Sequence, residues 1–133
     1  MKYLLDTNIY IYLIRHKPAQ VVERFNQHEA GEIGISSITV GELWYGVEKS
    51  QRPEQNGPAL IHFLLPLEIA FFDERAAMSY GKVRAALERQ GTPIGSLDTL
   101  IAAHTMSLEA VLVTNNAREF ERIPGLEVVN WAE

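Results

Sequence analysis

The sequence contains no cysteine, so disulfide bonds and thiolate metal sites are excluded. Long apolar runs are also missing, and no stretch approaches the ~20 residues that a membrane-spanning helix needs. The start lacks a secretory signal pattern, because Asp6 and Asn8 interrupt its short apolar run. We therefore expect a cytoplasmic protein with no membrane partner.

Positive charge is scarce as well, with 12 Lys and Arg against 17 Asp and Glu and a net charge of −5. Because nucleic-acid binding relies on clustered Lys and Arg, this balance argues against general affinity for nucleic acid. It does not exclude an enzyme that meets RNA locally, since a divalent cation lets carboxylates approach a phosphate. No glycine motif that cradles phosphate is present. Arg84, Arg89 and Arg118 are each as compatible with a solvated helix charge as with a phosphate contact.

What the sequence does contain is a regular alternation of strand and helix patterns over 133 residues, the length of one domain. Strands are predicted at 2–5, 33–36, 67–72, 110–114 and 126–129. Helices are predicted at 7–15, 18–28, around 40–47, 58–65, 74–90, 97–108 and 118–122. Asp73 and Gly91 bracket the longest helix as its N-cap and its C′ residue. Such alternation predicts an α/β domain with a mostly parallel sheet and helices on both faces.

Aspartate is rare, and two of the three aspartates lie at predicted junctions. Asp6 follows the apolar run 3–5, and Asp98 lies in the similarly punctuated stretch 93–99. Ligands of an open α/β sheet bind beyond the carboxyl ends of its strands, so Asp6 is placed for chemistry. Each aspartate also has a structural interpretation. Asp6 is a suitable helix cap, and a carboxylate at Asp98 stabilises the first turn of its helix by about 0.3–1 kcal/mol.

The other candidate side chains are weaker when taken alone. Glu42 points away from the apolar stripe of its helix, and only a position in the first turn, just after Ser37, would let it face a cleft. Glu119 is by default an exposed helical acid. His104 lies in an apolar stripe and is expected to be a hydrogen-bonded core residue. The remaining histidines lack metal-ligand spacing.

Four short motifs occur in order along the chain. They are Asp6-Thr7-Asn8, Glu42 within 39–43, Asp98 within 94–103, and Thr114-Asn115-Asn116 with Phe120. In this order, and on matching elements, they resemble the PIN-domain ribonucleases, and within them the VapC-like toxins of bacterial toxin–antitoxin pairs. The resemblance runs from Leu5 to Trp131. It implies a single PIN-like α/β/α sandwich over residues 1–133.

The resemblance implies that Asp6, Glu42 and Asp98 converge on one Mg²⁺ or Mn²⁺. Such cations prefer oxygen ligands, polarise a phosphoryl oxygen and lower the pKa of a bound water. Our hypothesis is that Asp6 and Asp98 hold the metal, while Glu42 orients its water or acts as the base. Asn8 and Thr114 would fix the carboxylates by hydrogen bonds.

One position departs from the pattern of the family. Many relatives have an aspartate where this chain has Asn116, which keeps the polar shape and loses the charge. Glu119 lies one helical turn later and is the candidate to supply the missing carboxylate. Fewer carboxylates would weaken the metal site and favour either Mn²⁺ or metal binding assisted by the substrate.

The resemblance also implies an RNA substrate and protein partners. The expected substrate is a tRNA, foremost initiator tRNA cut in its anticodon stem-loop, which would halt translation. A homodimer with a shared, basic-rimmed groove is implied, as is a cognate VapB-like antitoxin that lays an apolar helix along the toxin. Operator DNA would be met only through the antitoxin complex. The candidate docking side chains are Trp44, Tyr45, Phe63 and Leu64.

Two other functional classes compete with this interpretation. A receiver-like phosphoacceptor needs an acidic pair beside Asp6 and a lysine late in the sheet, and the stretches 4–6 and 113–115 provide neither. A PIN-like module that binds RNA or a partner without cleaving stays open, because Asn116 removes a carboxylate. Nuclease activity or its absence separates the PIN-like nuclease from the non-cleaving PIN-like module.

Overall fold

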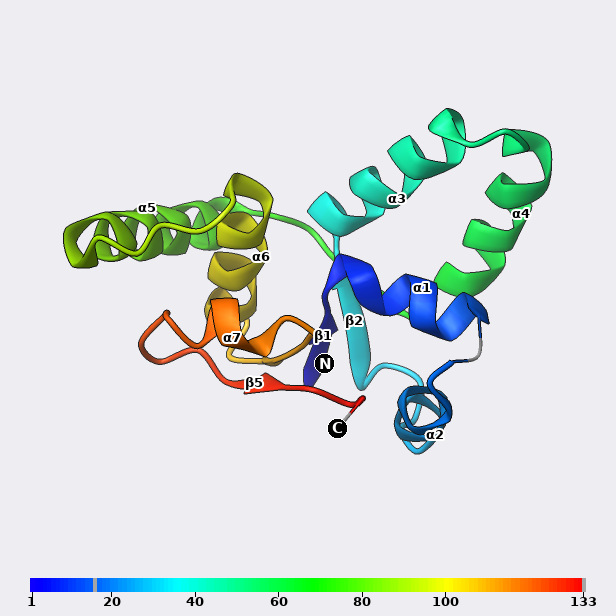
Figure 1. Ribbon diagram of the computed structural model, residues 1–133, viewed down its shortest axis with the longest axis horizontal. Coiled ribbons are helices and arrows are strands. Elements are labelled where there is room, and N and C mark those ends of the chain that lie inside the picture. The colour runs from blue at the N-terminus through cyan, green and yellow to red at the C-terminus, as the bar shows by residue number, and fades with distance from the viewer. Residues whose placement is uncertain (16, 133) are drawn as a thin grey trace.

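The computed structural model describes residues 1–15 and 17–132, which form a parallel five-stranded sheet with helices around it (Figure 1). The strands lie in the order β3-β2-β1-β4-β5, and each neighbouring pair is parallel. Their bounds are β1 (Tyr3–Leu5), β2 (Ile33–Ser36), β3 (Glu68–Ala70), β4 (Val111–Val113) and β5 (Val128–Val129). The predicted α/β class with a parallel sheet is confirmed.

The helices follow the predicted segments closely, with one exception. Their bounds are α1 (Thr7–Arg15), α2 (Ala19–Asn26), α3 (Ser37–Lys49), α4 (Pro53–Leu64), α5 (Glu74–Gln90), α6 (Ser96–Ser107) and α7 (Ala117–Phe120). The predicted start of the fourth helix at Pro58 is wrong, because α4 begins at Pro53. A proline is well tolerated in the first turn, where its missing N–H has no partner to lose, and Pro53 takes that place.

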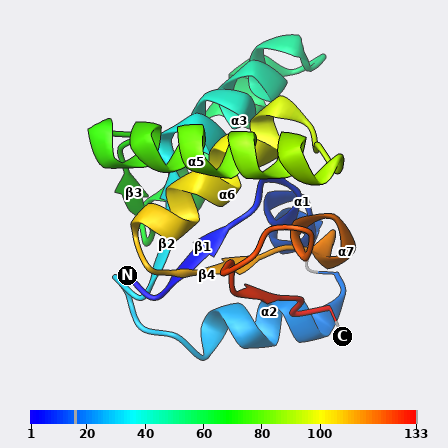
Figure 2. The ribbon, with the colours of Figure 1, turned by 90° about the vertical axis from the view of Figure 1, so that its left-hand side faces the viewer.

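The sheet separates two apolar cores. Leu4 and Leu112 pack on one face with Ile101 and Phe120, whereas Leu5 and Val113 pack on the other face. Successive residues of a strand point to opposite faces, which explains this division. Figure 2 shows α5 and α6 on one side of the sheet and α2 on the other. Burial on both faces also explains why the central strands β1 and β4 are continuous apolar runs.

The long helix α5 has the ends that were predicted for it. The Asp73 carboxylate accepts a hydrogen bond of 3.0 Å from the backbone N–H of Ala76. Gly91 has a φ of 74° and so adopts the left-handed conformation that favours glycine after a helix. None of the helices in the described ranges is both long and apolar enough to cross a membrane.

His104 joins α6 to the junction between β2 and α3. The side chain is 1% exposed, and its Nδ1 lies 2.8 Å from the Ser36 hydroxyl. The same hydroxyl accepts a hydrogen bond of 3.1 Å from the N–H of Ile38 and thereby caps α3. Burial lowers the pKa of His104, which favours the neutral ring. The expected hydrogen-bonded core histidine is confirmed.

Candidate active site

Asp6 lies at the carboxyl end of β1 and is almost fully buried, with 4% of its surface exposed. Its Oδ1 accepts a hydrogen bond of 2.8 Å from the N–H of Thr7, and its Oδ2 accepts one of 2.7 Å from the hydroxyl of Thr114. Burial raises the pKa of Asp6, and the two hydrogen bonds partly oppose that rise. The charged form is therefore held in one orientation at a cost in solvation.

Thr114 comes next to Asp6 because of the strand register. Leu5 of β1 pairs with Val113 of β4, so the residue after each strand lies at the same edge of the sheet. The Thr114 hydroxyl donates to Asp6 and accepts a hydrogen bond of 2.9 Å from the N–H of Asn116. The predicted contact of Thr114 with a carboxylate is thus present. Asn8 is exposed, and in the described chain its side chain makes no hydrogen bond to a carboxylate.

Asp98 lies in the first turn of α6 and is half-buried. Burial, together with the nearby negative charges of Glu119 and Asp6, raises its pKa to about 6. The fold therefore brings three acidic groups from α6, α7 and the end of β1 close enough to repel one another. Like charges gathered in a partly buried site favour protonation unless a cation joins them.

Glu119 is held in this cluster by two neighbours. The side-chain amide of Asn116 donates a hydrogen bond to its Oε2, and the N–H of Gly95 donates one of 3.4 Å to its Oε1. Glu119 also contributes to the raised pKa values of both Asp6 and Asp98. Asn116 does not supply a charge; it positions the carboxylate of a residue one turn later.

Glu42 is placed differently from the other acidic candidates. Helix α3 begins at Ser37, so Glu42 lies in the second turn, and its predicted position in the first turn was wrong. The side chain is half-buried and lines a cavity of about 370 Å³ with Tyr10, Ile14 and Asn56, between α1, α3 and α4. Its charge is not among those that shift the pKa of Asp6 or Asp98. The convergence of Glu42 with the two aspartates stays a prediction.

The donor set fits a hard divalent cation. Asp6, Asp98 and Glu119 offer only oxygen atoms, which Mg²⁺ and Mn²⁺ accept. No lysine or arginine of the described chain is among the groups that shift the pKa of Asp6 or Asp98. Within residues 1–15 and 17–132, no three acidic or histidine side chains lie close enough to enclose a metal as they stand. One or two carboxylates with waters and phosphate suffice for Mg²⁺.

Two contacts in the site were not foreseen from the sequence. The backbone N–H of Gly95 donates a hydrogen bond to Glu119, and a Cβ added at Gly95 would lie 3.9 Å from Asp98 Oδ2. The amide of Asn115 donates a hydrogen bond to the hydroxyl of Tyr12, which joins α1 to the loop after β4. The position of Gly95 just before α6 was the available signal for the first contact.

The chain belongs to the PIN domain family, whose model matches residues 3–126. It is 47% identical to the tRNA(fMet)-specific endonuclease VapC of Shigella flexneri, over 99% of each chain. It is also 47% identical to the ribonuclease VapC2 of Haemophilus influenzae, over 98% of each chain. The resemblance found in the sequence motifs is confirmed.

Solved structures of similar proteins support this family membership. The VapC chain of the DNA-bound VapBC complex from Salmonella typhimurium superposes with a TM-score of 0.93, at 47% identity over 98% of each chain. A VapBC2 complex from Rickettsia felis, bound to a promoter DNA fragment, gives a TM-score of 0.90 at 43% identity, over 98% of this chain and 99% of that one. The predicted PIN-like sandwich is therefore confirmed.

Proposed function

We propose that this chain is an endoribonuclease toxin that uses Mg²⁺ or Mn²⁺ to cleave tRNA, with initiator tRNA cut in its anticodon stem-loop as the preferred substrate. One observation carries the proposal. The buried carboxylate of Asp6, hydrogen-bonded on both oxygens, shares the strand-end edge of a PIN domain with Asp98 and Glu119. Similarity to a tRNA(fMet)-specific endonuclease supports the choice of substrate.

In this proposal Asp6 and Asp98 hold the cation, and Glu119 supplies the carboxylate that Asn116 lacks. When bound, the cation polarises a phosphoryl oxygen and lowers the pKa of a water. Thr114 fixes the orientation of Asp6 through its hydroxyl, and Asn116 fixes Glu119 through its amide. Carboxylates that are oriented before the substrate arrives need little reorganisation during the reaction.

We assign Glu42, on α3, the role of orienting or deprotonating the attacking water. Its half-buried setting beside Tyr10 provides a wall of low polarity on one side. Asn8 is exposed in the first turn of α1, directly after the Asp6 junction, and we assign it a contact with the RNA. These roles divide the site into a metal-holding side and a water-activating side.

A VapB-like antitoxin is the proposed protein partner, because solved relatives are VapBC complexes. An apolar cavity of about 610 Å³ lies between α1, α2 and α4, and Leu13, Phe25 and Phe63 line it. Tyr45 is 62% exposed and offers a second apolar contact. Trp44 and Leu64, the other two candidate docking side chains, are half-buried. This cavity adjoins the one that Glu42 lines, because Phe63 packs against Tyr10 with ring centroids 4.8 Å apart.

Operator DNA is proposed to be met only through the antitoxin complex, because the net charge of −5 opposes direct binding. A homodimer is part of the same proposal. Phe71 and Met78, which are 77% and 61% exposed, are apolar surface that a second copy would cover.

Cleavage of total tRNA by the purified chain tests the function. Parallel reactions contain Mg²⁺, Mn²⁺ or chelator, and Asp98→Asn of verified fold is the matched inactive control. Discrete fragments that need metal and vanish in the variant support the nuclease, and the mapped ends name the RNA. Fragments that persist in chelator or in the variant contradict it.

A PIN module that binds RNA without cleaving it is the second candidate. The observation that favours it is that the charge of Glu42 is not among those that raise the pKa of Asp6 or Asp98. Calorimetric binding of Mn²⁺ together with tRNA binding, but no cleavage under any metal, would select this candidate over the nuclease.

A further inference from the structure

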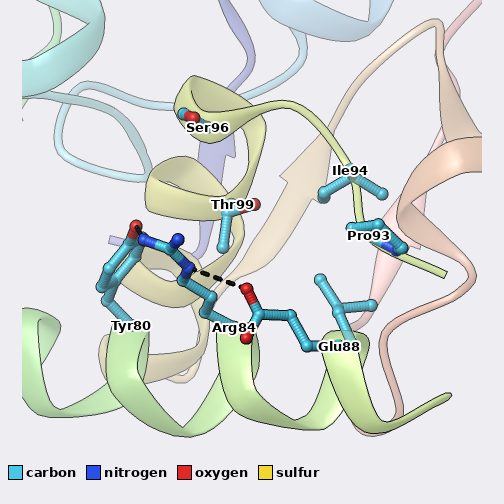
Figure 3. A pocket seen from close by; sticks show the side chains of 8 residues that line it. Tyr80, Arg84, Glu88, Pro93, Ile94, Ser96 and Thr99 are labelled. Atoms are coloured by element: carbon cyan, nitrogen blue, oxygen red, sulfur yellow. Dashed lines mark hydrogen bonds and ion pairs between the residues drawn. The ribbon is translucent and has the colours of Figure 1, made fainter. Parts of the chain in front are cut away.

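A small cavity of about 150 Å³ lies between α5 and the start of α6 (Figure 3). Its apolar lining comes from Leu87, Pro93, Ile94 and the ring of Tyr80. Its polar lining includes Arg84 and Glu88, which Figure 3 shows side by side on α5. Apolar walls with a few placed polar groups are typical of a small-ligand site.

The cavity adjoins the carboxylate cluster. The loop from Pro93 to Ser96 forms one of its walls. Gly95 of the same loop donates to Glu119 and lies beside Asp98. The hydroxyl of Thr99, which also lines the cavity, donates a hydrogen bond of 2.8 Å to the carbonyl of Gly95. One short stretch of chain thus separates the cavity from the proposed cleavage centre.

Arg84 is held in place by two partners on its own helix. Its Nε donates a hydrogen bond of 3.2 Å to Glu88 Oε2, and its Nη1 donates one of 3.0 Å to the hydroxyl of Tyr80. A guanidinium has five N–H donors, so three stay available to a ligand. The side chains of Arg84 and Glu88 are 60% and 59% exposed, and solvent reaches both.

The paired charges favour a nucleobase over a phosphate. The Arg84–Glu88 ion pair carries no net charge, so it attracts a phosphate weakly while it offers both donors and an acceptor. The edge of a base presents hydrogen-bond acceptors and donors that can pair with the donors of Arg84 and the acceptor of Glu88. The flat faces of a base can stack on the apolar walls and on the guanidinium plane. Unpaired bases of an RNA loop are the bases that can be splayed out into such a site.

We propose that the cavity between α5 and α6 binds one unstacked base of the RNA substrate beside the scissile phosphodiester, and that Arg84 and Glu88 recognise this base by hydrogen bonds. The proposal rests on the proposed nuclease function and adds a specificity-determining subsite to it. Tyr80 acts as a positioning residue that fixes the guanidinium through its hydroxyl. The sequence alone left Arg84 as an undecided helix charge.

The test uses a stem-loop RNA whose loop is randomised, cleaved by the full chain and sequenced at the cut ends. Glu88→Gln keeps the shape of the acceptor and changes its hydrogen-bonding pattern. Glu74→Gln, exposed in the first turn of α5 and outside the cavity, is the matched control. We expect Glu88→Gln to lower the preference for one base at one fixed distance from the cut by about tenfold. The control should keep the wild-type preference.

A uniform fall in rate over all bases, or an unchanged preference at every position, overturns the subsite. Photo-crosslinking with the Asp98→Asn chain and the same RNA carrying 4-thiouridine separates this failure from failure of the nuclease. Crosslinks to Tyr80 or to the 93–96 loop support base binding even where the wild type does not cleave. Crosslinks confined to other segments contradict it.

Discussion

Thr114 donates a hydrogen bond of 2.7 Å to Oδ2 of Asp6 across the junction of β1 and β4, and both side chains are buried. The bond joins residues that are 108 positions apart in the chain. The neighbouring strands β1 and β4, in the middle part of the sheet, therefore also position Asp6, the proposed metal ligand. Loss of this bond should affect folding and catalysis together.

We expect Thr114→Val to lower the free energy of unfolding by about 1–3 kcal/mol, because it leaves a buried carboxylate oxygen without its donor. Urea unfolding followed by circular dichroism measures the change. Thr114→Ser keeps the hydroxyl and should stay within about 1 kcal/mol of the wild type. Equal stability of the valine variant and the wild type would contradict the importance of this bond.

Asp98→Asn should stabilise the metal-free protein at neutral pH. The pKa of Asp98 is raised from its usual 3.8 to about 6, so the folded state binds a proton more tightly than the unfolded state. The resulting penalty is absent below about pH 4, grows between pH 4 and 6, and is complete above that range. Because Asp98 is only half-buried, we expect a gain of about 1 kcal/mol at pH 7 after solvent screening.

Unfolding in urea with chelator at pH 4 and at pH 7 checks this sign. The variant should unfold at a higher urea concentration than the wild type at pH 7, and the difference should nearly vanish at pH 4. A variant that is less stable at pH 7 would show that the charge of Asp98 is compensated in the metal-free protein.

Addition of Mn²⁺ or Mg²⁺ at pH 7 should raise the melting temperature of the wild type. A ligand that binds only the folded state at about 100 times its Kd adds about 2.7 kcal/mol. Asp6→Asn should abolish most of the shift, because it removes one of the carboxylates assigned to the cation. Glu121→Gln, an exposed acid just after α7, serves as the control and should keep the full shift.

Glu119→Gln should lower the rate of RNA cleavage by roughly 10- to 100-fold, the range seen for groups that support a metal site. Asn116→Asp in the same chain should restore part of the rate, because it returns a carboxylate to this edge of the site. Single-turnover cleavage of tRNA measures both variants. A double variant no faster than Glu119→Gln alone would show that position 116 cannot replace Glu119.

The strand ends were predictable from the sequence, because short apolar runs that stop at polar residues mark them directly. That pattern placed Asp6 and Thr114 at one edge of a parallel sheet, and the structure agrees. The start of α4 was not predictable, because two prolines compete for the first turn. The position of Glu42 in the second turn of α3 depends on Ser36 serving as the N-cap, and helical periodicity does not fix that.

The contacts of Glu119 and Gly95 lie beyond sequence reasoning for a different reason. They depend on how the single turn of α7 faces the loop before α6, which is a matter of tertiary packing. Spacing along the chain showed only that Glu119 follows Asn116 by one turn. Whether that turn faces the carboxylates or solvent is decided by Phe120, which is fully buried beneath α7.

The Ser36 hydroxyl serves two helices at once, since it caps α3 and contacts His104 of α6. The helices that carry Glu42 and Asp98 thus share one buried anchor, and neither can slide toward the other without breaking it. In our proposal, Glu42 would therefore approach the cation by changing its own side-chain torsions. Its extra methylene gives it more reach than an aspartate would have, so Glu42→Asp should shorten that reach while leaving the framework intact.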